Sequence, residues 1–354
     1  MAIMRVVKPK KTYKQWLGSV MRYNTPPASS KPLSLEMVND TYRQLSAKNG
    51  TRISRGEESR KVHFTGMEQN MLQGKEWMDI FHNISNKQDL ISLFTSYLKN
   101  ESIDLSQNMP VFFTNKDETW RVSQNALSRL PDCNHEEADT KMLVHALRED
   151  TDVVIVARDT DVLILMVYVY AKHHVKRNWY MKYAAGKYAN IGKIVAHLGV
   201  VVSLKLPHIH AITGCDTTSY FHGVGKMRVL NTCLKQPHLL SLLSNLGSSS
   251  GEPSRYKDIE RFINTVCYSG HIGETVVETR VRLYKRQKVK TSQSIPPDPD
   301  SMKQAILRIN HQLYYWVRCN INMTETIPLE DNGWIVAEDS VIPVWFTGEP
   351  YKLL

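Results

Sequence analysis

Two pairs of acidic residues near the middle of the chain have the types and spacing that could do chemistry. Glu137-Ala138-Asp139 and Asp159-Thr160-Asp161 each place two carboxylates one residue apart. Carboxylates that lie close together repel one another unless a hard divalent cation such as Mg²⁺ or Mn²⁺ neutralises them. Two such ions about 3.5–4 Å apart can activate a water molecule and stabilise the leaving oxygen of a phosphodiester. If the two pairs converge, they predict metal-dependent hydrolysis of a phosphate ester.

The segments around the two pairs indicate how they could converge. Residues 137–149 carry a helical stripe of apolar side chains, and residues 153–157 are a continuous β-branched run typical of a strand buried on both faces of a parallel sheet. The helix must run back along the sheet before the strand returns, so its start and the strand's carboxyl end share the edge where open α/β sheets bind ligands. Followed by a buried helix over 161–170, this order predicts an α/β fold with a mostly parallel sheet. Taken alone, Asp159-Thr160-Asp161 is better explained by a helix cap plus a turn residue, and capping can also explain the first pair, so that alternative stays open.

A third feature is the glycine-rich stretch that follows these elements. Ile212 to Thr218 contains Gly-Cys-Asp, and Gly223-Val224-Gly225-Lys226 follows it. A glycine turn between helices exposes backbone N–H groups that can hold a nucleic-acid phosphate, helped by Lys226 and Arg228. The spacing of a Walker phosphate loop is absent. We therefore predict nucleic-acid binding by Gly223, Gly225, Lys226 and Arg228, with a simple helix end followed by a turn as the alternative.

The charge balance narrows the class of partner. The 354 residues include 45 Lys and Arg against 35 Asp and Glu, which gives a net charge of +10 at pH 7. This excess favours a polyanion as partner, although charge alone does not separate nucleic acid from an acidic membrane face. Apolar residues make up 42% and charged residues 23%, so a disordered or fibrous chain is a poor interpretation.

Cysteine usage and apolar runs indicate the compartment. The five cysteines show no C-x-x-C spacing, which argues against a disulfide framework and a cysteine zinc site and favours a reducing compartment. The longest apolar run, 162–171, is too short for a bilayer core of about 30 Å, and the lysine-rich start does not resemble a secretory signal. We predict an intracellular protein that does not cross a membrane.

Changes in composition divide the chain into three predicted parts. Residues 1–246 form the main α/β domain, 247–300 a basic connection rich in Gly, Ser and Pro, and 301–354 a helix and a Trp-containing segment that pack back on the core. The basic run 280–290 fits a solvated linker or strand, an arm that tracks phosphates, or, through Lys285-Arg286-Gln287-Lys288, a nuclear-import signal. The last alternative predicts a nuclear location.

Two further helices are predicted from caps and periodicity. Ser85 to Gln88 form a capping-box pattern before apolar residues at helical spacing. Asp300-Ser301 can cap a second helix whose apolar face is core-facing. The apolar residues are Leu90, Phe94 and Tyr97 in the first helix, and Ile306, Ile309, Leu313 and Trp316 in the second. Trp334 and Trp345 are predicted to pack back on the fold.

Taken together, the motifs resemble the PIN-like, flap-endonuclease type of 5′ nuclease. That superfamily has, in order, an E-A-E or E-A-D pair, a D-x-D after the next core strand, a G-C-D, and a helix-hairpin-helix-like G-h-G. This chain has Glu137-Ala138-Asp139, Asp159-Thr160-Asp161, Gly214-Cys215-Asp216 and Gly223-Val224-Gly225. The resemblance covers roughly residues 35–230 by motif. The surrounding pattern is similar to an animal, mobile-element-associated branch of the superfamily.

The resemblance implies a fold, a cofactor and a set of ligands. The implied fold is a three-layer PIN-like domain with a mostly parallel central sheet and a helix-hairpin-helix-like insertion after the core. The implied cofactor is Mg²⁺ or Mn²⁺, two ions if the protein is active, and the implied partner is DNA. The implied ligands are Glu137, Asp139, Asp159 and Asp161, which are also the catalytic residues, together with Asp216, directly or through water, and Asp40 after the second core strand. Asp40 could equally be a loop aspartate.

The chain departs from the superfamily at its start. The superfamily begins with a short apolar strand that ends in an Asp of the metal site, whereas this chain begins Met1-Ala2-Ile3-Met4 and has no acidic residue before Glu36. Either the chain is truncated or this first ligand and its strand are missing. One hypothesis is metal-dependent hydrolysis of DNA flaps, branches or single-stranded ends. The second is an impaired, mobile-element-derived protein that binds nucleic acid or a protein partner without cleavage, and the third is an unrelated α/β protein whose acids are caps and surface groups.

Overall fold

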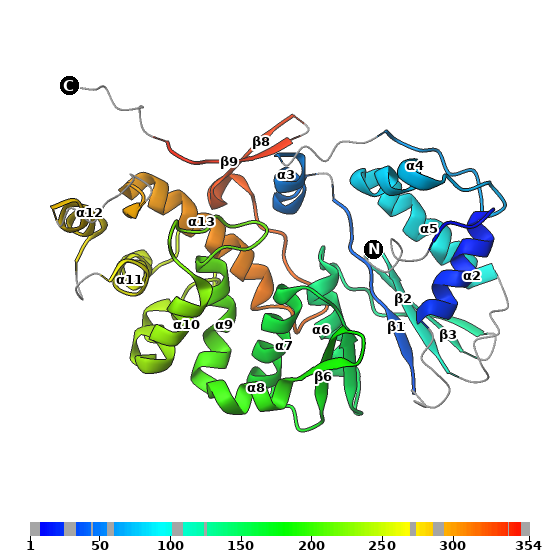
Figure 1. Ribbon diagram of the computed structural model, residues 1–354, viewed down its shortest axis with the longest axis horizontal. Coiled ribbons are helices and arrows are strands. Elements are labelled where there is room, and N and C mark those ends of the chain that lie inside the picture. The colour runs from blue at the N-terminus through cyan, green and yellow to red at the C-terminus, as the bar shows by residue number, and fades with distance from the viewer. Residues whose placement is uncertain are drawn as a thin grey trace. The chain divides into compact units, whose positions relative to one another are not determined.

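The chain folds into two compact units (Figure 1), seen in a computed structural model. The first unit consists of Met1–Gln44 and Arg52–Lys141, and the second of Leu45–Thr51 and Met142–Leu354. Each has its own sheet and its own hydrophobic core, and the protein is of the mixed α/β class. The residues that the structure describes are 8–24, 33–43, 45–54, 60–100, 109–123, 126–269, 274–285, 294–338 and 340–347.

The first unit is built on a four-stranded sheet with the order β1-β2-β3-β4. Strands β1 and β2 are parallel, and the other two pairs are antiparallel. Its core is aromatic, because the Trp77 ring meets Trp16 and Phe81 edge to face with centroids 4.8 and 5.0 Å apart. The elements are α2 (Tyr13–Asn24), β1 (Leu35–Met37), α4 (Gly74–Asp79), η2 (Ile80–His82), α5 (Ile84–Asn100), β2 (Val111–Asn115), β3 (Glu118–Ser123), β4 (Ala126–Leu130) and the start of α6 (Ala138–Arg148).

The second unit contains a three-stranded sheet, a two-stranded ribbon and most of the helices. Strand β5 is parallel to β6, which pairs antiparallel with β7, and β8 pairs antiparallel with β9. The elements are α3 (Ala47–Ser54, through residues 45–51), the rest of α6, β5 (Val153–Val156), α7 (Thr160–Lys172), β6 (Trp179–Ala184), β7 (Lys187–Asn190), α8 (Ile191–Leu198), α9 (Val200–Ile212), α10 (Lys226–Lys235), η3 (Pro237–Leu243), α11 (Tyr256–Phe262), the π-helix η4 (Ile263–Cys267), α12 (Val276–Lys285), α13 (Pro299–Trp316), η6 (Glu330–Asn332), β8 (Trp334–Ala337) and β9 (Ser340–Pro343).

Helix α7 is the centre of the second unit. Its sequence is apolar on every side after the first turn, which is the pattern of a helix that is enclosed rather than half-exposed. It packs against α8 and α9, and the core continues from it to the inner face of β5 and β6 and to α13. Side chains of α7 that are buried are Val162, Leu165, Met166, Val167, Tyr168, Val169 and Ala171.

The prediction of one mostly parallel sheet is wrong for the described residues. Only β1–β2 and β5–β6 are parallel, and the remaining pairs are antiparallel. The β2–β3 hairpin turns through Lys116 and Asp117, with Lys116 at φ 51°, and the β6–β7 hairpin turns at Gly186, with φ 66°. Two-residue hairpin turns require such positive φ values. Neither turn contains the Asn-Gly pair from which a hairpin is most readily predicted in a sequence.

The predicted strand at 153–157 is present as β5, but its burial differs from the prediction. Ile155 is buried, whereas Val154 and Val156 are 52% and 58% exposed. A short apolar run does not show by itself how many faces of a strand are covered, because hydrophobicity has no period to read when every residue is apolar. The strand is therefore covered on one face only.

The segment predicted as a connection, 247–300, contains helices in its described part. It contains α11, η4 and α12, and its inward residues belong to the main core of the second unit. The Gly, Ser and Pro residues at the two ends of the segment predicted a connection, although apolar residues at helical spacing lie between them. The buried residues of this period are Ile259, Phe262, Ile263 and Val266. Most of the candidate import signal, from Arg286, lies outside the described residues, as does the chain start at Met1–Val7.

Both predicted helix caps lie slightly earlier than expected. Helix α5 begins at Ile84, and Asn83 Oδ1 accepts the N–H of Asn86 at 3.2 Å. Helix α13 begins at Pro299, and Asp298 is its N-cap. In each case a residue just before the expected cap offers the side-chain oxygen that reaches the first-turn N–H groups.

The C-terminal tryptophans behave differently from each other. Trp334 is 1% exposed and shares a small core with Ala47 and Val341. Trp345 is 59% exposed, although the Arg308 guanidinium lies 4.9 Å from its ring centroid. The prediction of a packed tryptophan is thus confirmed for Trp334 and wrong for Trp345.

None of the single helices in the described ranges has both the length and the hydropathy of a membrane span. Helices α8 and α9 reach that hydropathy only as a pair, and the chain bends by 100° between them.

Candidate functional site

The second acidic pair lies where β5 gives way to α7. Asp159 is the N-cap of α7, and its Oδ1 accepts the backbone N–H of Asp161 at 3.0 Å. This contact satisfies one of the N–H groups that the first turn of every helix leaves unpaired. Asp159 is exposed and Asp161 half-buried. The capping alternative therefore describes what Asp159 does in this structure, while Asp161 points to other partners.

Asp161 is paired with a histidine from α9. Its Oδ1 lies 2.7 Å from Nε2 of His210, whose side chain is buried against Trp316 with ring centroids 5.8 Å apart. Nδ1 of the same imidazole lies 3.2 Å from Nζ of Lys226. A neutral ring that carries its proton on Nε2 satisfies both contacts, because it donates to the carboxylate and accepts from the ammonium. Asp161, His210 and Lys226 thus form a connected polar chain, which we call the acid–histidine–lysine chain.

His210 is a residue that the sequence reasoning missed. It lies in an apolar helix two residues after His208, and both are buried. Burial lowers the pKa of His208 to about 3, so that histidine is a neutral core group. The spacing alone could not have distinguished the two, because only the partner at Asp161 makes His210 part of the site.

The Gly-Cys-Asp turn is held rigidly after α9. Gly214 has φ +98°, and a Cβ there would lie 2.8 Å from Cβ of Tyr220. Burial raises the pKa of the Cys215 thiol, and the nearby Asp161 carboxylate adds to that effect, so Cys215 is not an activated nucleophile. Thr218 Oγ1 lies 3.2 Å from the Cys215 sulfur and donates to the Ala211 carbonyl oxygen. The turn leaves Asp216 exposed.

The second glycine turn opens the amino-terminal end of α10. Gly223 has φ +73°, and no atom lies within 4 Å of a Cβ placed on it or on Gly225. Gly225 is the N-cap of α10 and offers no side chain to its first N–H groups. Lys226 is exposed at this end, whereas Arg228 donates to the carbonyl oxygen of Cys267. The predicted phosphate-binding set is thus placed at one open helix end, except that Arg228 is engaged elsewhere.

The carboxylate of Asp40 contacts the start of α6, where the first acidic pair lies. Asp40 Oδ1 accepts the backbone N–H of Ala138 at 2.8 Å, and Tyr42 donates its hydroxyl to Oδ2 at 3.1 Å. Ala138 lies between Glu137 and Asp139, both half-buried. Asp40 is a loop aspartate after β1, as the alternative predicted, and its carboxylate contacts the start of α6 beside the first acidic pair. It also caps α6, because it satisfies a first-turn N–H group.

A buried lysine lies beneath this acidic group. Lys141 is fully buried, and its Nζ donates to Thr41 Oγ1 and to the Lys116 carbonyl oxygen, both at 2.6 Å. Burial lowers the pKa of Lys141 to about 8. The ammonium ties the segment around Asp40 to the β2–β3 hairpin. Sequence reasoning missed it, because a lysine in an amphipathic helix normally lies on the solvated face.

We found no match for this protein among known proteins. No protein-family model, curated protein or solved structure matches the chain. The nuclease resemblance therefore rests on the sequence motifs alone.

The acidic residues do not form a site for a divalent cation in the described parts of the chain. In the described parts of the chain, no three or more His, Cys, Asp and Glu side chains are arranged so that they could hold a metal ion. Asp40 uses both carboxylate oxygens in hydrogen bonds, and Asp161 uses Oδ1 for His210. As arranged here, the carboxylates do not fit the implied cation. The two acidic pairs belong to different units, and their convergence stays a prediction.

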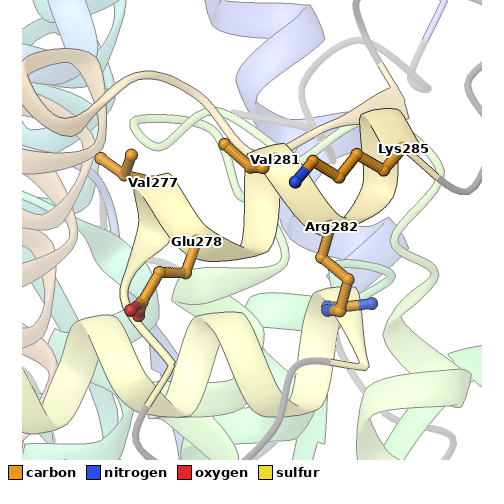
Figure 2. Close-up of a pocket in the computed structure, with 5 residues that line it drawn as sticks. All are labelled: Val277, Glu278, Val281, Arg282 and Lys285. Carbon is orange, nitrogen blue, oxygen red and sulfur yellow. The ribbon is translucent and has the colours of Figure 1, made fainter.

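Two hollows on the described surface are lined by other residues. Figure 2 shows one of about 470 Å³ along α12, where Val277 and Val281 share the lining with three charged side chains. Arg282 there is held by Glu274 at 2.9 Å. The other, of about 420 Å³, includes Asp150 before β5 and Arg177 before β6. No predicted site residue lines either hollow.

Proposed function

We propose that the protein acts on nucleic acid as a PIN-like phosphodiester hydrolase that requires Mg²⁺ or Mn²⁺. The observation that carries this proposal is the acid–histidine–lysine chain. It links the Asp161 carboxylate to Lys226, which stands at the open amino-terminal end of α10. A phosphodiester hydrolase needs carboxylates beside a position that binds phosphate. In this unit, two polar contacts through His210 connect the Asp161 carboxylate to Lys226 at the proposed phosphate position.

Each residue has a defined task in this proposal. Lys226 and the first N–H groups of α10 bind one phosphate of the substrate backbone, because the helix end and the ammonium are both positive. His210 positions Asp161 beside that phosphate. The net charge of +10 favours the approach of DNA flaps, branches or single-stranded ends. The acids at 137, 139, 159 and 161 remain the proposed catalytic set, with Asp40 and Asp216 as further proposed ligands.

The contacts that the carboxylates already make favour a second function, which is nucleic-acid binding without cleavage. Asp40 is committed to a helix cap and Asp161 to His210, and the described side chains form no metal-holding group. These contacts would suit a protein that binds nucleic acid without cleaving it. Both functions share the phosphate-binding end of α10 and differ only in turnover.

A cleavage assay separates the two functions. Labelled flap and single-stranded DNA would be incubated with Mg²⁺ or Mn²⁺ and wild-type protein, Asp159→Ala/Asp161→Ala protein, or the matched control Asp150→Ala. Asp150 is exposed and precedes β5, at the end of the strand away from Asp159. The hydrolase predicts cleavage by wild type and control and its loss in the double variant. Equal product from all three proteins would reject catalysis by these acids, and binding with no product would favour the second function.

A further inference from the structure

The sheet β5–β6–β7 has one covered face and one open face, whose side chains are exposed or half-buried. Ile155, Trp179 and Met181 point to the covered face, where they are 6%, 0% and 3% exposed and pack into the core that α7 also lines. Because neighbours across a sheet share a face, the strand register assigns six other side chains to the open face. They form two rows, Val154–Tyr180–Asn190 and Val156–Lys182–Tyr188.

The chemistry of the open face is aromatic and basic. Its six side chains include two tyrosines, one lysine, two valines and no acid. Tyr188 is 52% exposed, and the Lys182 ammonium lies 5.9 Å from its ring centroid. The valines, at 52% and 58% exposure, add an apolar floor beside the rings. Lys187 extends the positive charge at the start of β7, where it is exposed.

This combination fits unpaired bases. Proteins bind single-stranded nucleic acid with aromatic rings that stack on bases and with cations that follow the phosphates. A protein partner is a poorer fit, because protein interfaces are depleted of lysine at their centres and Lys182 is central here. We propose that this face, the tyrosine platform, binds the bases of single-stranded nucleic acid, with Tyr180 and Tyr188 as stacking surfaces and Lys182 as the phosphate contact.

The platform also predicts the substrate class of the proposed hydrolase, and this one inference rests on the proposed function. The row that contains Val156 is the one nearer the carboxyl end of β5, and Asp159 follows three residues later. A strand lying along that row would lead toward the acidic pair. Base-paired DNA hides its base faces within the stack, so the platform predicts a preference for single-stranded over duplex substrates.

Binding in EDTA tests the platform without any turnover. Fluorescence anisotropy would compare a labelled 12-nucleotide oligo(dT) with an abasic chain of the same length, for wild type, Tyr188→Ala and Tyr188→Phe. We expect Tyr188→Ala to weaken oligo(dT) binding about tenfold and to leave abasic binding unchanged, with near-wild-type affinity in the Phe variant. Ile335→Ala is the control, because Ile335 is a large apolar side chain that is 51% exposed on strand β8.

Several results would overturn the platform. Equal affinity for oligo(dT) and the abasic chain would mean that the protein does not bind the bases. Equal losses for Tyr188→Ala and the control would remove Tyr188 from the surface that binds. Self-association by sedimentation, abolished in Tyr188→Ala, would assign the face to a second copy instead. Oligo(dT) binding in EDTA with no cleavage in Mn²⁺ would support the platform and count against the hydrolase, so the two failures are distinguishable.

Discussion

The carboxylate of Asp161 and the imidazole of His210 lie 2.7 Å apart, joining the first turn of α7 to the last turn of α9. The imidazole is 4% exposed as a side chain and the carboxylate 16%. A pair so poorly solvated is costly to break, because the partner left behind keeps its desolvation penalty. This contact both organises the candidate site and connects two helices of the core.

Replacing His210 tests this contact. We expect His210→Phe to lower the free energy of unfolding by about 1–3 kcal/mol, because Asp161 would lose its partner while staying partly buried. In the background of Asp161→Asn the same change should cost less. Urea unfolding of the two single variants and the double variant gives the coupling energy. Strictly additive losses would show that the two side chains do not stabilise each other.

Lys141 should give the first unit a distinctive dependence on pH. Its pKa is lowered to about 8 by burial, whereas an unfolded lysine titrates near 10.4. Between these values the folded chain releases a proton that the unfolded chain retains, so stability rises with pH across this window. The free energy of unfolding of wild type, relative to Lys141→Met, should therefore increase from pH 8 to pH 10. A difference that stays constant, or falls, would contradict the lowered pKa of Lys141.

Asp40 should behave as the cap of α6. Asp40→Ala removes the acceptor for the Ala138 N–H, and we expect a loss of about 1 kcal/mol in unfolding free energy. Asp40→Asn retains a side-chain oxygen and should lose less. Asp89→Ala, at an exposed position within α5, is the control in the same urea titration. Identical stabilities for the Ala and Asn variants would contradict the capping role.

Two glycines in the candidate site should respond differently to alanine. Gly214 has φ +98° and no room for a Cβ, so Gly214→Ala should destabilise the protein by about 1–3 kcal/mol. Gly225 has φ −83° and open space around it, so Gly225→Ala should leave stability nearly unchanged. Thermal unfolding followed by circular dichroism compares them. A larger loss at Gly225 would reverse the assignment of the strained turn.

The open end of α10 predicts unequal roles for its two cations. Lys226→Gln should weaken DNA binding and reduce the slope of log K against log salt by about 0.7–0.9, the value for one phosphate contact. Arg228→Gln should change the slope less, because that guanidinium is engaged with the Cys267 carbonyl oxygen. Binding isotherms at several salt concentrations measure both. A larger slope change for Arg228 would place the phosphate elsewhere.

Local patterns predicted several elements, and long-range contacts explain what they missed. The apolar runs located β5 and α7, and the periodicity at Ile306 located α13. Lys141 and His210 could not be assigned in this way, since their partners Thr41 and Asp161 lie 100 and 49 residues away in the sequence. Burial of a polar side chain depends on such partners rather than on its neighbours in sequence.

The open face of the β5–β6–β7 sheet is another feature that local sequence patterns could not predict. Val154 and Val156 belong to a run that reads as wholly buried, and only the register with Tyr180 and Lys182 reveals that they share an exposed face. The grouping of Asp40 with the start of α6 was implied by resemblance, and its geometric cause, the Ala138 N–H, required coordinates.

The proposed hydrolase requires the acids at the start of α7 to bind a divalent cation, which they do not fit as arranged in this structure. Titration of Mn²⁺, with the unbound ion followed by electron paramagnetic resonance, tests this requirement most directly in wild type, Asp159→Asn/Asp161→Asn protein and the Asp150→Asn control. The account predicts Mn²⁺ binding by wild type and control that weakens at least about tenfold in the double variant, as expected when ligands are removed. The same Mn²⁺ affinity in all three proteins, or no binding to wild type, would contradict it.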